Sequence, residues 1–211
     1  MHYFVKTCKR DISRVNRLIS QISLCSLSPY RLTVVADEDC AESVNHSTII
    51  AETAFPELLD VNPYLAQQWI KLNAFKYATG EVMLIDSDYY PVRPYYDDQL
   101  FSVKSKYDVM SHETAITPNY PYIAGHTKLF GVPPTKAYLI NIPCVVPAYC
   151  LEDFSKTQRY ADFLKFIQEN ISVSEFDTFF THVMGTADAN LFNEVSKQGQ
   201  LTPIRRLFAR D

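Results

Sequence analysis

The sequence predicts an α/β domain whose central sheet is mostly parallel and flanked by helices, followed by a less regular C-terminal half. Three short apolar runs, at residues 3–7, 32–36 and 82–85, are typical of buried strands. Amphipathic helical patterns separate these runs along the chain. Strands and helices that alternate at this spacing favour right-handed crossovers, so we expect the three strands to be parallel central neighbours.

The connecting helices have recognisable starts. Asp11 stands at the N-cap position of a helix whose apolar residues recur at helical spacing over residues 12–22. A second helix is predicted over residues 62–78, with Gly80 at its C-cap. Between them, residues 47–51 suggest a third short strand.

The second half alternates short elements with long proline-containing loops. Residues 107–110 and 137–140 resemble strands, and apolar spacing predicts one helix over 154–167 and another over 174–184. The basic end, residues 205–210, is either a fraying tail or a docking segment. Ordered long loops over a rigid sheet commonly carry function.

Composition favours a packed protein of a reducing compartment. A chain that is 47% hydrophobic and 21% charged can bury an ordinary core. The five cysteines form no Cys-x-x-Cys pair, so neither a zinc knuckle nor a disulfide framework is indicated. No apolar run approaches the ~20 residues that span a bilayer. We therefore expect a cytoplasmic protein, at most peripheral to a membrane.

Several function classes are disfavoured. With five glycines and neither a Gly-x-Gly-x-x-Gly nor a P-loop sequence, a dinucleotide-binding enzyme or P-loop NTPase is not expected. The Gly-x-Ser-x-Gly elbow of one hydrolase class is also absent. A net charge of -4 argues against a large nucleic-acid surface, and a nucleic-acid acceptor stays open without being indicated.

Two carboxylates follow the strand at residues 82–85. Asp86 and Asp88 are two positions apart, so an extended backbone directs both side chains to the same face. Hard carboxylate oxygens at a strand end can hold Mn²⁺ or Mg²⁺ together with phosphate oxygens. The alternative is an Asx-type turn that merely ends the strand.

The sequence around this pair resembles a known family. Residues 84–94, Leu-Ile-Asp-Ser-Asp-Tyr-Tyr-Pro-Val-Arg-Pro, resemble the metal-binding strand of glycosyltransferases with the GT-A fold. Residues 67–74, 4–11 and 174–179 are similar to the preceding helix, the first strand and loop, and a late acidic motif of a bacterial and phage branch of these proteins. The resemblance spans residue 3 to about 185 and is loose from 95 to 170.

This resemblance implies a single domain with a nucleotide-binding half, residues 1–94, and an acceptor-side half, residues 95–211. It implies that the metal is held by Asp86 and Asp88. The residues that it implies for the nucleotide sugar are Thr7, Lys9, Arg10, Asp11, Asp37, Gln67, Lys71 and Ser87. For three of these, an ordinary structural role competes: helix capping for Asp11, a solvated turn for Asp37, and a solvated helix face for Lys71.

The late acidic motif offers two catalytic candidates, Glu175 and Asp177. Ser174 and Asp177 have the spacing of a capping box, which would by itself account for Asp177. Glu175 is not needed for capping and could be a general base toward an acceptor hydroxyl if the enzyme inverts configuration. Three histidines are candidate third metal ligands or acceptor contacts, although a lone histidine is more often structural: His112, His126 and His182.

The function expected from the resemblance is metal-dependent transfer of a sugar to a glycan or another hydroxyl acceptor. The expected donor is a nucleoside diphosphate sugar, with a UDP-sugar preferred. Two alternatives remain: a nucleotidyltransferase, and a glycosyltransferase-like binding module that has lost activity. The first normally wants a glycine-rich phosphate loop near the N-terminus, and residues 7–11 contain no glycine.

Overall fold

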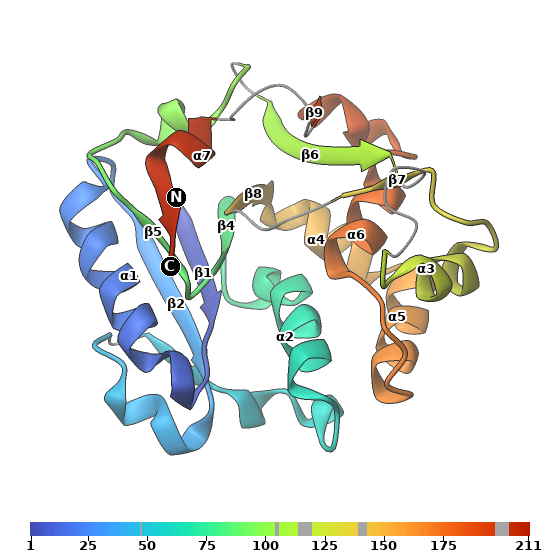
Figure 1. Cartoon of the computed structure of the whole chain (residues 1–211), viewed down its shortest axis with the longest axis horizontal. Helices are drawn as coiled ribbons and strands as arrows, with labels where there is room; N and C mark the ends of the chain where they lie inside the picture. The colour runs from blue at the N-terminus through green and yellow to red at the C-terminus, as the bar shows by residue number, and fades with distance from the viewer. Residues whose placement is uncertain (47, 104–105, 114–119, 139–142, 197–202) are drawn as a thin grey trace.

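The computed structural model describes residues 1–46, 48–103, 106–113, 120–138, 143–196 and 203–211. A five-stranded sheet in the order β3-β2-β1-β4-β8 forms the centre (Figure 1). Its strands are β1 (His2–Lys6), β2 (Arg31–Ala36), β3 (Ile49–Ala51), β4 (Glu81–Asp86) and β8 (Cys144–Pro147). All neighbours pair in parallel except β8, which runs antiparallel to β4. The predicted mostly parallel sheet, with β2, β1 and β4 adjacent, is confirmed.

Two smaller sheets and seven α-helices complete the described architecture. The strands β6 (Tyr107–Glu113), β7 (Lys136–Ala137) and β9 (Phe192–Ser196) form one sheet, and β5 (Tyr89–Pro91) pairs with β10 (Phe208–Arg210). The helices are α1 (Ile12–Cys25), α2 (Pro63–Leu72), α3 (Ile123–Phe130), α4 (Ala148–Ser155), α5 (Gln158–Gln168), α6 (Glu175–Val183) and α7 (Pro203–Leu207). Single 3-10 turns lie at Lys9–Asp11, Glu38–Ser43, Glu52–Ala54, Pro56–Leu58, Ala74–Lys76, Asp97–Leu100 and Ala187–Leu191.

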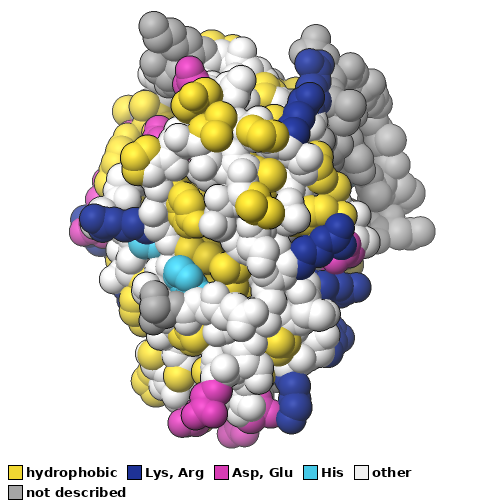
Figure 2. Space-filling model, turned by 90° about the vertical axis from the view of Figure 1, so that its left-hand side faces the viewer, with side chains coloured by type: hydrophobic (Ala, Val, Ile, Leu, Met, Phe, Trp, Pro, Cys, Tyr) yellow, Lys and Arg dark blue, Asp and Glu magenta, His cyan; other side chains and the backbone are white. Residues whose placement is uncertain are grey.

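Side chains of the central strands alternate between two apolar cores, one on each face of the sheet. Phe4 and Leu84 face the layer that contains α2, α4, α5 and α6, whereas Tyr3 and Met83 face α1 and the C-terminal segment. Both faces of the sheet are therefore covered, which explains why these strands are continuously apolar. Figure 2, which views the side of α1, shows further apolar side chains at the surface among polar ones.

Two element boundaries and one helix cap differ from the predictions. The second helix ends at Leu72, with Asn73 and not Gly80 as its C-cap, because the Asn73 side chain donates to the Trp69 carbonyl at 2.9 Å and competes with the helical ladder. Gly80 still has a positive φ of 75°, in the turn that enters β4. The single helix expected over 154–167 is two helices, because Thr157 caps the start of α5 by accepting from the Tyr160 N–H. Asp11 stands at the N-cap of α1, but its side chain makes no capping hydrogen bond.

Other expected elements lie partly outside the described residues. The third strand begins at Ile49, and residue 47 is not described; the strand expected at 137–140 contributes only Lys136–Ala137, because residues 139 and 140 are not described. The basic C-terminal end docks through β10. Within the described part of the chain, no helix has the length and apolar character needed to cross a membrane.

Candidate functional site

The carboxyl ends of β1, β2 and β4 meet at one edge of the sheet. Lys6 pairs in register with Asp86, and the Thr7 N–H donates to the Val35 carbonyl at 2.8 Å. The residues that follow these strands are therefore near neighbours. Open α/β sheets bind their ligands at this edge.

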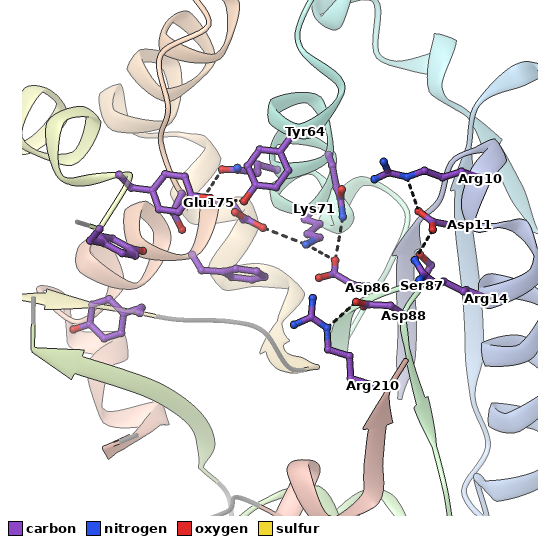
Figure 3. Close-up of a pocket in the computed structure, with 17 residues that line it drawn as sticks. Arg10, Asp11, Arg14, Tyr64, Lys71, Asp86, Ser87, Asp88, Glu175 and Arg210 are labelled. Atoms are coloured by element: carbon purple, nitrogen blue, oxygen red, sulfur yellow. Dashed lines mark hydrogen bonds and ion pairs between the residues drawn. The ribbon is translucent and has the colours of Figure 1, made fainter. Parts of the chain in front are cut away.

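Lys71 of α2 lies between two carboxylates (Figure 3). Its Nζ is 2.6 Å from Oδ1 of Asp86 and 3.2 Å from Oε1 of Glu175. Lys71 is only 5% exposed and Glu175 only 6%. Burial lowers the pKa of Lys71, but the two carboxylates outweigh burial and hold that pKa above its ordinary value. For Glu175, burial raises the pKa and outweighs the positive charge of Lys71, which by itself would lower it. Lys71 is thus part of a buried ion-pair network and not of a solvated helix face.

The two predicted metal carboxylates have different partners. Asp86 Oδ1 also accepts from Gln67 Nε2 at 3.1 Å, whereas Asp88 Oδ2 accepts from Arg210 Nε at 2.8 Å. Asp88 Oδ1 is buried and has no hydrogen-bond partner among the described residues. A buried carboxylate oxygen without a partner is costly. Hard divalent cations prefer such oxygens, so Asp88 fits the ion that the family resemblance implies.

A second acidic group lies at the end of β2. Single ligand atoms of Asp37, Asp39 and Cys40 come within 4.8 Å of one another, a spacing that could hold a metal ion. However, lysines pair with both carboxylates, Lys6 with Asp37 at 2.5 Å and Lys9 with Asp39 at 3.2 Å. Burial also raises the pKa of the Cys40 thiol, which favours its protonated form. Asp86 and Asp88 also pair with cations, so what favours Asp88 is its buried Oδ1, which has no hydrogen-bond partner among the described residues.

The histidines lie elsewhere. Of the residues that the structure describes, those lining the cavity at Asp86 and Asp88 include no histidine. His112 is in β6 with its ring 5.9 Å from that of Tyr120, and His126 packs on Phe130. The proposal of a histidine as third metal ligand has no geometric support from these positions.

Asp177 is not explained by capping. Ser174 does cap α6 by accepting from the Asp177 N–H at 3.3 Å. The Asp177 carboxylate, only 1% exposed, instead accepts from the Tyr120 hydroxyl and from the Tyr138 N–H. Burial raises the pKa of Asp177 to about 7, although both donors oppose the rise. The expectation that capping alone accounts for this residue is wrong, because its side chain joins α6 to two distant loops.

Two adjoining cavities receive the predicted residues. The first has a volume of about 380 Å³, and its ionic wall faces an aromatic one. The ionic wall consists of Arg10, Asp11, Arg14, Lys71, Asp86, Asp88, Glu175 and Arg210. The aromatic wall consists of Tyr64, Tyr120, Tyr122, Tyr138 and Phe176. Asp177 is not among the lining residues, so it lies behind the aromatic wall and not at its surface.

The second cavity, of about 620 Å³, lies at the ends of β1 and β2. Thr7, Lys9 and Asp37 line it, and the buried Thr7 Oγ1 has no hydrogen-bond partner among the described residues. The two cavities share Arg10, Asp11, Tyr64, Gln67 and Ser87. The residues predicted for the metal and the nucleotide sugar therefore divide between two adjoining cavities, with Asp37 in the second and Lys71 and Asp88 in the first.

A triad of one buried lysine and two partly exposed carboxylates lines one side of the second cavity. Lys6 Nζ lies 2.5 Å from Asp37 and 2.9 Å from Glu52. Burial would raise the pKa of Asp37, but hydrogen bonds with Glu52 and Lys6 outweigh it and hold that pKa below its usual value. Asp37 is therefore a member of an ion-pair network, although its side chain is still 34% exposed to solvent.

Asp11 bridges the two cavities as an ion-pair partner. Its Oδ1 accepts from Arg14 Nη1 at 2.9 Å, and its Oδ2 is 3.5 Å from Arg10 Nε. The Arg10 side chain is 87% exposed, and the Lys9 side chain 76%. Both cations are thus free to reorient toward a ligand at the rim.

The residues of this region that sequence reasoning missed include Glu52, Tyr64, Tyr120, Tyr138 and Arg210. The first four belong to no local sequence motif. Each lines a cavity or contacts Asp177 only because the fold brings distant parts of the chain together. Arg210 had a partial signal, since the basic end was a candidate docking segment.

Comparison with known proteins gives a match of fold but none of sequence. No protein-family model and no curated protein matches the sequence. Among solved structures, the chain is similar to the crystal structure of galactosyltransferase LgtC in complex with donor and acceptor sugar analogues. The two are 9% identical with a TM-score of 0.51, over 84% of this chain and 69% of that one. At this identity the likeness concerns the fold alone: the chain shares the α/β fold of that structure, with a mostly parallel sheet flanked by helices.

Proposed function

We propose that this protein is a metal-dependent glycosyltransferase that moves a sugar from a nucleoside diphosphate sugar to a hydroxyl acceptor. The observation that carries the proposal is the buried Oδ1 of Asp88 beside Asp86, which has no hydrogen-bond partner in the described part of the chain and lies at the ligand-binding edge of the sheet. Similarity of fold to a galactosyltransferase supports the same class of reaction.

Asp88, assisted by Asp86, would hold Mn²⁺ or Mg²⁺. A divalent ion there supplies positive charge that stabilises a departing diphosphate. The two carboxylates already lie beside Lys71 and Arg210, so the same edge also offers fixed positive charge from the protein.

The paired cavities suit the two ends of a nucleotide sugar. We assign the nucleoside to the second cavity. There the Thr7 hydroxyl, which has no partner among the described residues, can donate or accept a hydrogen bond, and the Asp37 carboxylate can accept one from base or ribose. The diphosphate would cross the shared rim beside Arg10 and Ser87. The transferred sugar would then lie in the first cavity, between the carboxylates and the aromatic wall.

Glu175 is the candidate base at that position. It lines the first cavity, and its raised pKa brings it closer to the working pH of a proton acceptor. In an inverting reaction it would take the acceptor hydroxyl proton while the acceptor oxygen bonds the anomeric carbon and the bond to the diphosphate breaks. Lys71 positions this carboxylate at 3.2 Å.

The proposal is tested by calorimetric titration of a nucleoside diphosphate, with and without Mn²⁺, after a thermal-shift screen of nucleotide sugars has identified the base. Asp88→Asn should weaken Mn²⁺-dependent binding by at least about tenfold, because even indirect partners of metal ligands contribute that much. The matched control is Asp98→Asn, at an exposed acidic position outside both cavities.

Equal affinity in the Asp88→Asn and Asp98→Asn proteins would remove the metal site from the proposal. Tight Mn²⁺-dependent binding without release of free sugar or transfer to any acceptor would instead identify an inactive binding module. Release of pyrophosphate from a nucleoside triphosphate would identify a nucleotidyltransferase.

A further inference from the structure

The last strand of the chain ends at the candidate metal site. In β10, Arg210 pairs with Tyr89 of β5, the residue directly after Asp88. The Asp211 N–H also donates to the Asp88 carbonyl at 2.9 Å. A residue more than a hundred positions away in sequence is thereby fixed beside the carboxylate that the β4 turn presents.

This strand is held by contacts that do not involve the Arg210 side chain. Ile204, Leu207 and Phe208 are each less than 7% exposed and belong to the core beneath α1. Arg17 Nη1 also pairs with Asp211 at 2.7 Å. Apolar burial and backbone hydrogen bonds therefore anchor the segment, and the guanidinium of Arg210 is not needed to keep it in place.

The guanidinium itself is directed to the cavity (Figure 3). Arg210 Nε donates to Asp88 Oδ2 at 2.8 Å, and the side chain is 52% exposed. Among the described residues this is the one hydrogen bond that the side chain makes. The remaining N–H groups of a guanidinium form a planar fork that matches two phosphate oxygens.

Charge balance indicates what this fork would bind. Four cationic and four anionic side chains line the first cavity, so its formal charge is zero. A divalent cation and a dianionic diphosphate can enter together without disturbing that balance. A cation on Asp88 would also compete with Arg210 for the carboxylate, leaving the guanidinium beside the incoming phosphates.

We propose that Arg210 is a diphosphate-binding residue, delivered to the donor site by the C-terminal strand. This inference rests on the proposed function, because it assigns Arg210 to the same donor. Arg210 exchanges its hydrogen bond with Asp88 for hydrogen bonds to diphosphate oxygens, so that cation and diphosphate bind cooperatively.

The test compares Arg210→Gln with Arg206→Gln, a matched change at an exposed arginine of the same segment. The probes are uridine, guanosine, adenosine and cytidine diphosphates and the four nucleosides, titrated with Mn²⁺ present. For the diphosphate that binds tightest to wild type, Arg210→Gln should lose about ten- to a hundredfold in affinity, as expected for lost charge-assisted hydrogen bonds. Affinity for the corresponding nucleoside should stay unchanged.

Two further measurements separate binding from structure. Arg210→Lys should recover part of the lost affinity, since it keeps the charge without the fork. The melting temperature of Arg210→Gln should match that of Arg206→Gln, because the strand is anchored elsewhere. Unchanged diphosphate affinity in Arg210→Gln, or equal losses for diphosphate and nucleoside, would overturn this inference while leaving the proposed function intact. Absence of diphosphate binding to wild type would overturn both.

Discussion

Replacing Lys71 by methionine tests the buried ion-pair network directly. Methionine keeps most of the aliphatic stem and removes the charge between Asp86 and Glu175. Removing one partner of a buried pair costs about 3–5 kcal/mol, because a carboxylate then stays buried without compensation. Asp86 is 31% exposed and regains some hydration, whereas Glu175 is almost fully buried, so we expect a loss near 3 kcal/mol.

The measurement is urea-induced unfolding at neutral pH, with Lys165→Met as the matched control. Lys165 also lies on a helix, but it is 69% exposed and 3.9 Å from its partner Glu169. An exposed pair of this kind contributes at most about 0.5 kcal/mol. The two variants therefore make the same Lys-to-Met substitution at lysines that differ in burial and in ion pairing.

A double variant identifies the source of the loss. Glu175→Gln in the Lys71→Met background removes the buried charge that the first change left unpaired, so part of the stability should return. If Lys71→Met costs no more than Lys165→Met, the buried network does not stabilise the fold and the assigned geometry is wrong.

Two further predictions concern Asp177 and Gly125, both in the second half of the chain. The pKa of Asp177 is about 7 in the folded protein, against an ordinary value of 3.8. Between these two pH values the folded state holds a proton that the unfolded state has lost. The free energy of unfolding should therefore fall as the pH rises from about 4 to about 7, by at most ~4 kcal/mol. Asp177→Asn resembles the protonated acid and should lose this dependence; denaturation curves between about pH 4 and pH 7 that parallel wild type would contradict the assignment. Gly125→Ala should destabilise α3 by about 1–3 kcal/mol, because the new Cβ would lie 2.1 Å from the Ser172 carbonyl oxygen. The measurement is thermal unfolding of both variants. Gly185→Ala, whose Cβ would lie 3.3 Å from its nearest neighbour, should cost clearly less stability, and equal losses would argue against the close packing at Gly125.

Local pattern was sufficient where an element depends on its own residues. The strands β1, β2 and β4 are apolar throughout because both faces of the sheet are covered, and the helical spacing of α1 and α6 matches their buried faces. The position of Asp86 and Asp88 follows from the same logic, since a strand that ends in two carboxylates brings them to the edge where its parallel neighbours also end.

Local pattern failed where a distant partner decides the outcome. The C-terminal end of α2 depends on Asn73, whose side-chain Oδ1 accepts from the hydroxyl of Tyr160, a residue of another helix. Asp177 has the spacing of a capping-box residue, yet its carboxylate accepts hydrogen bonds from the Tyr120 hydroxyl and the Tyr138 N–H. Neither contact has a sequence signature, because the partners are far apart in the chain.

Hydrophobic periodicity and right-handed crossovers thus predict the parallel sheet, its adjacent central strands and the acidic edge. The charges that meet at this edge, in contrast, depend on how the whole chain folds. Lys71 pairs with Glu175 from 104 positions away, and Arg210 with Asp88 from 122. The physical reason is burial: removal from water makes an unpaired charge costly, so the folded chain selects partners by proximity in space, which the order of residues does not contain.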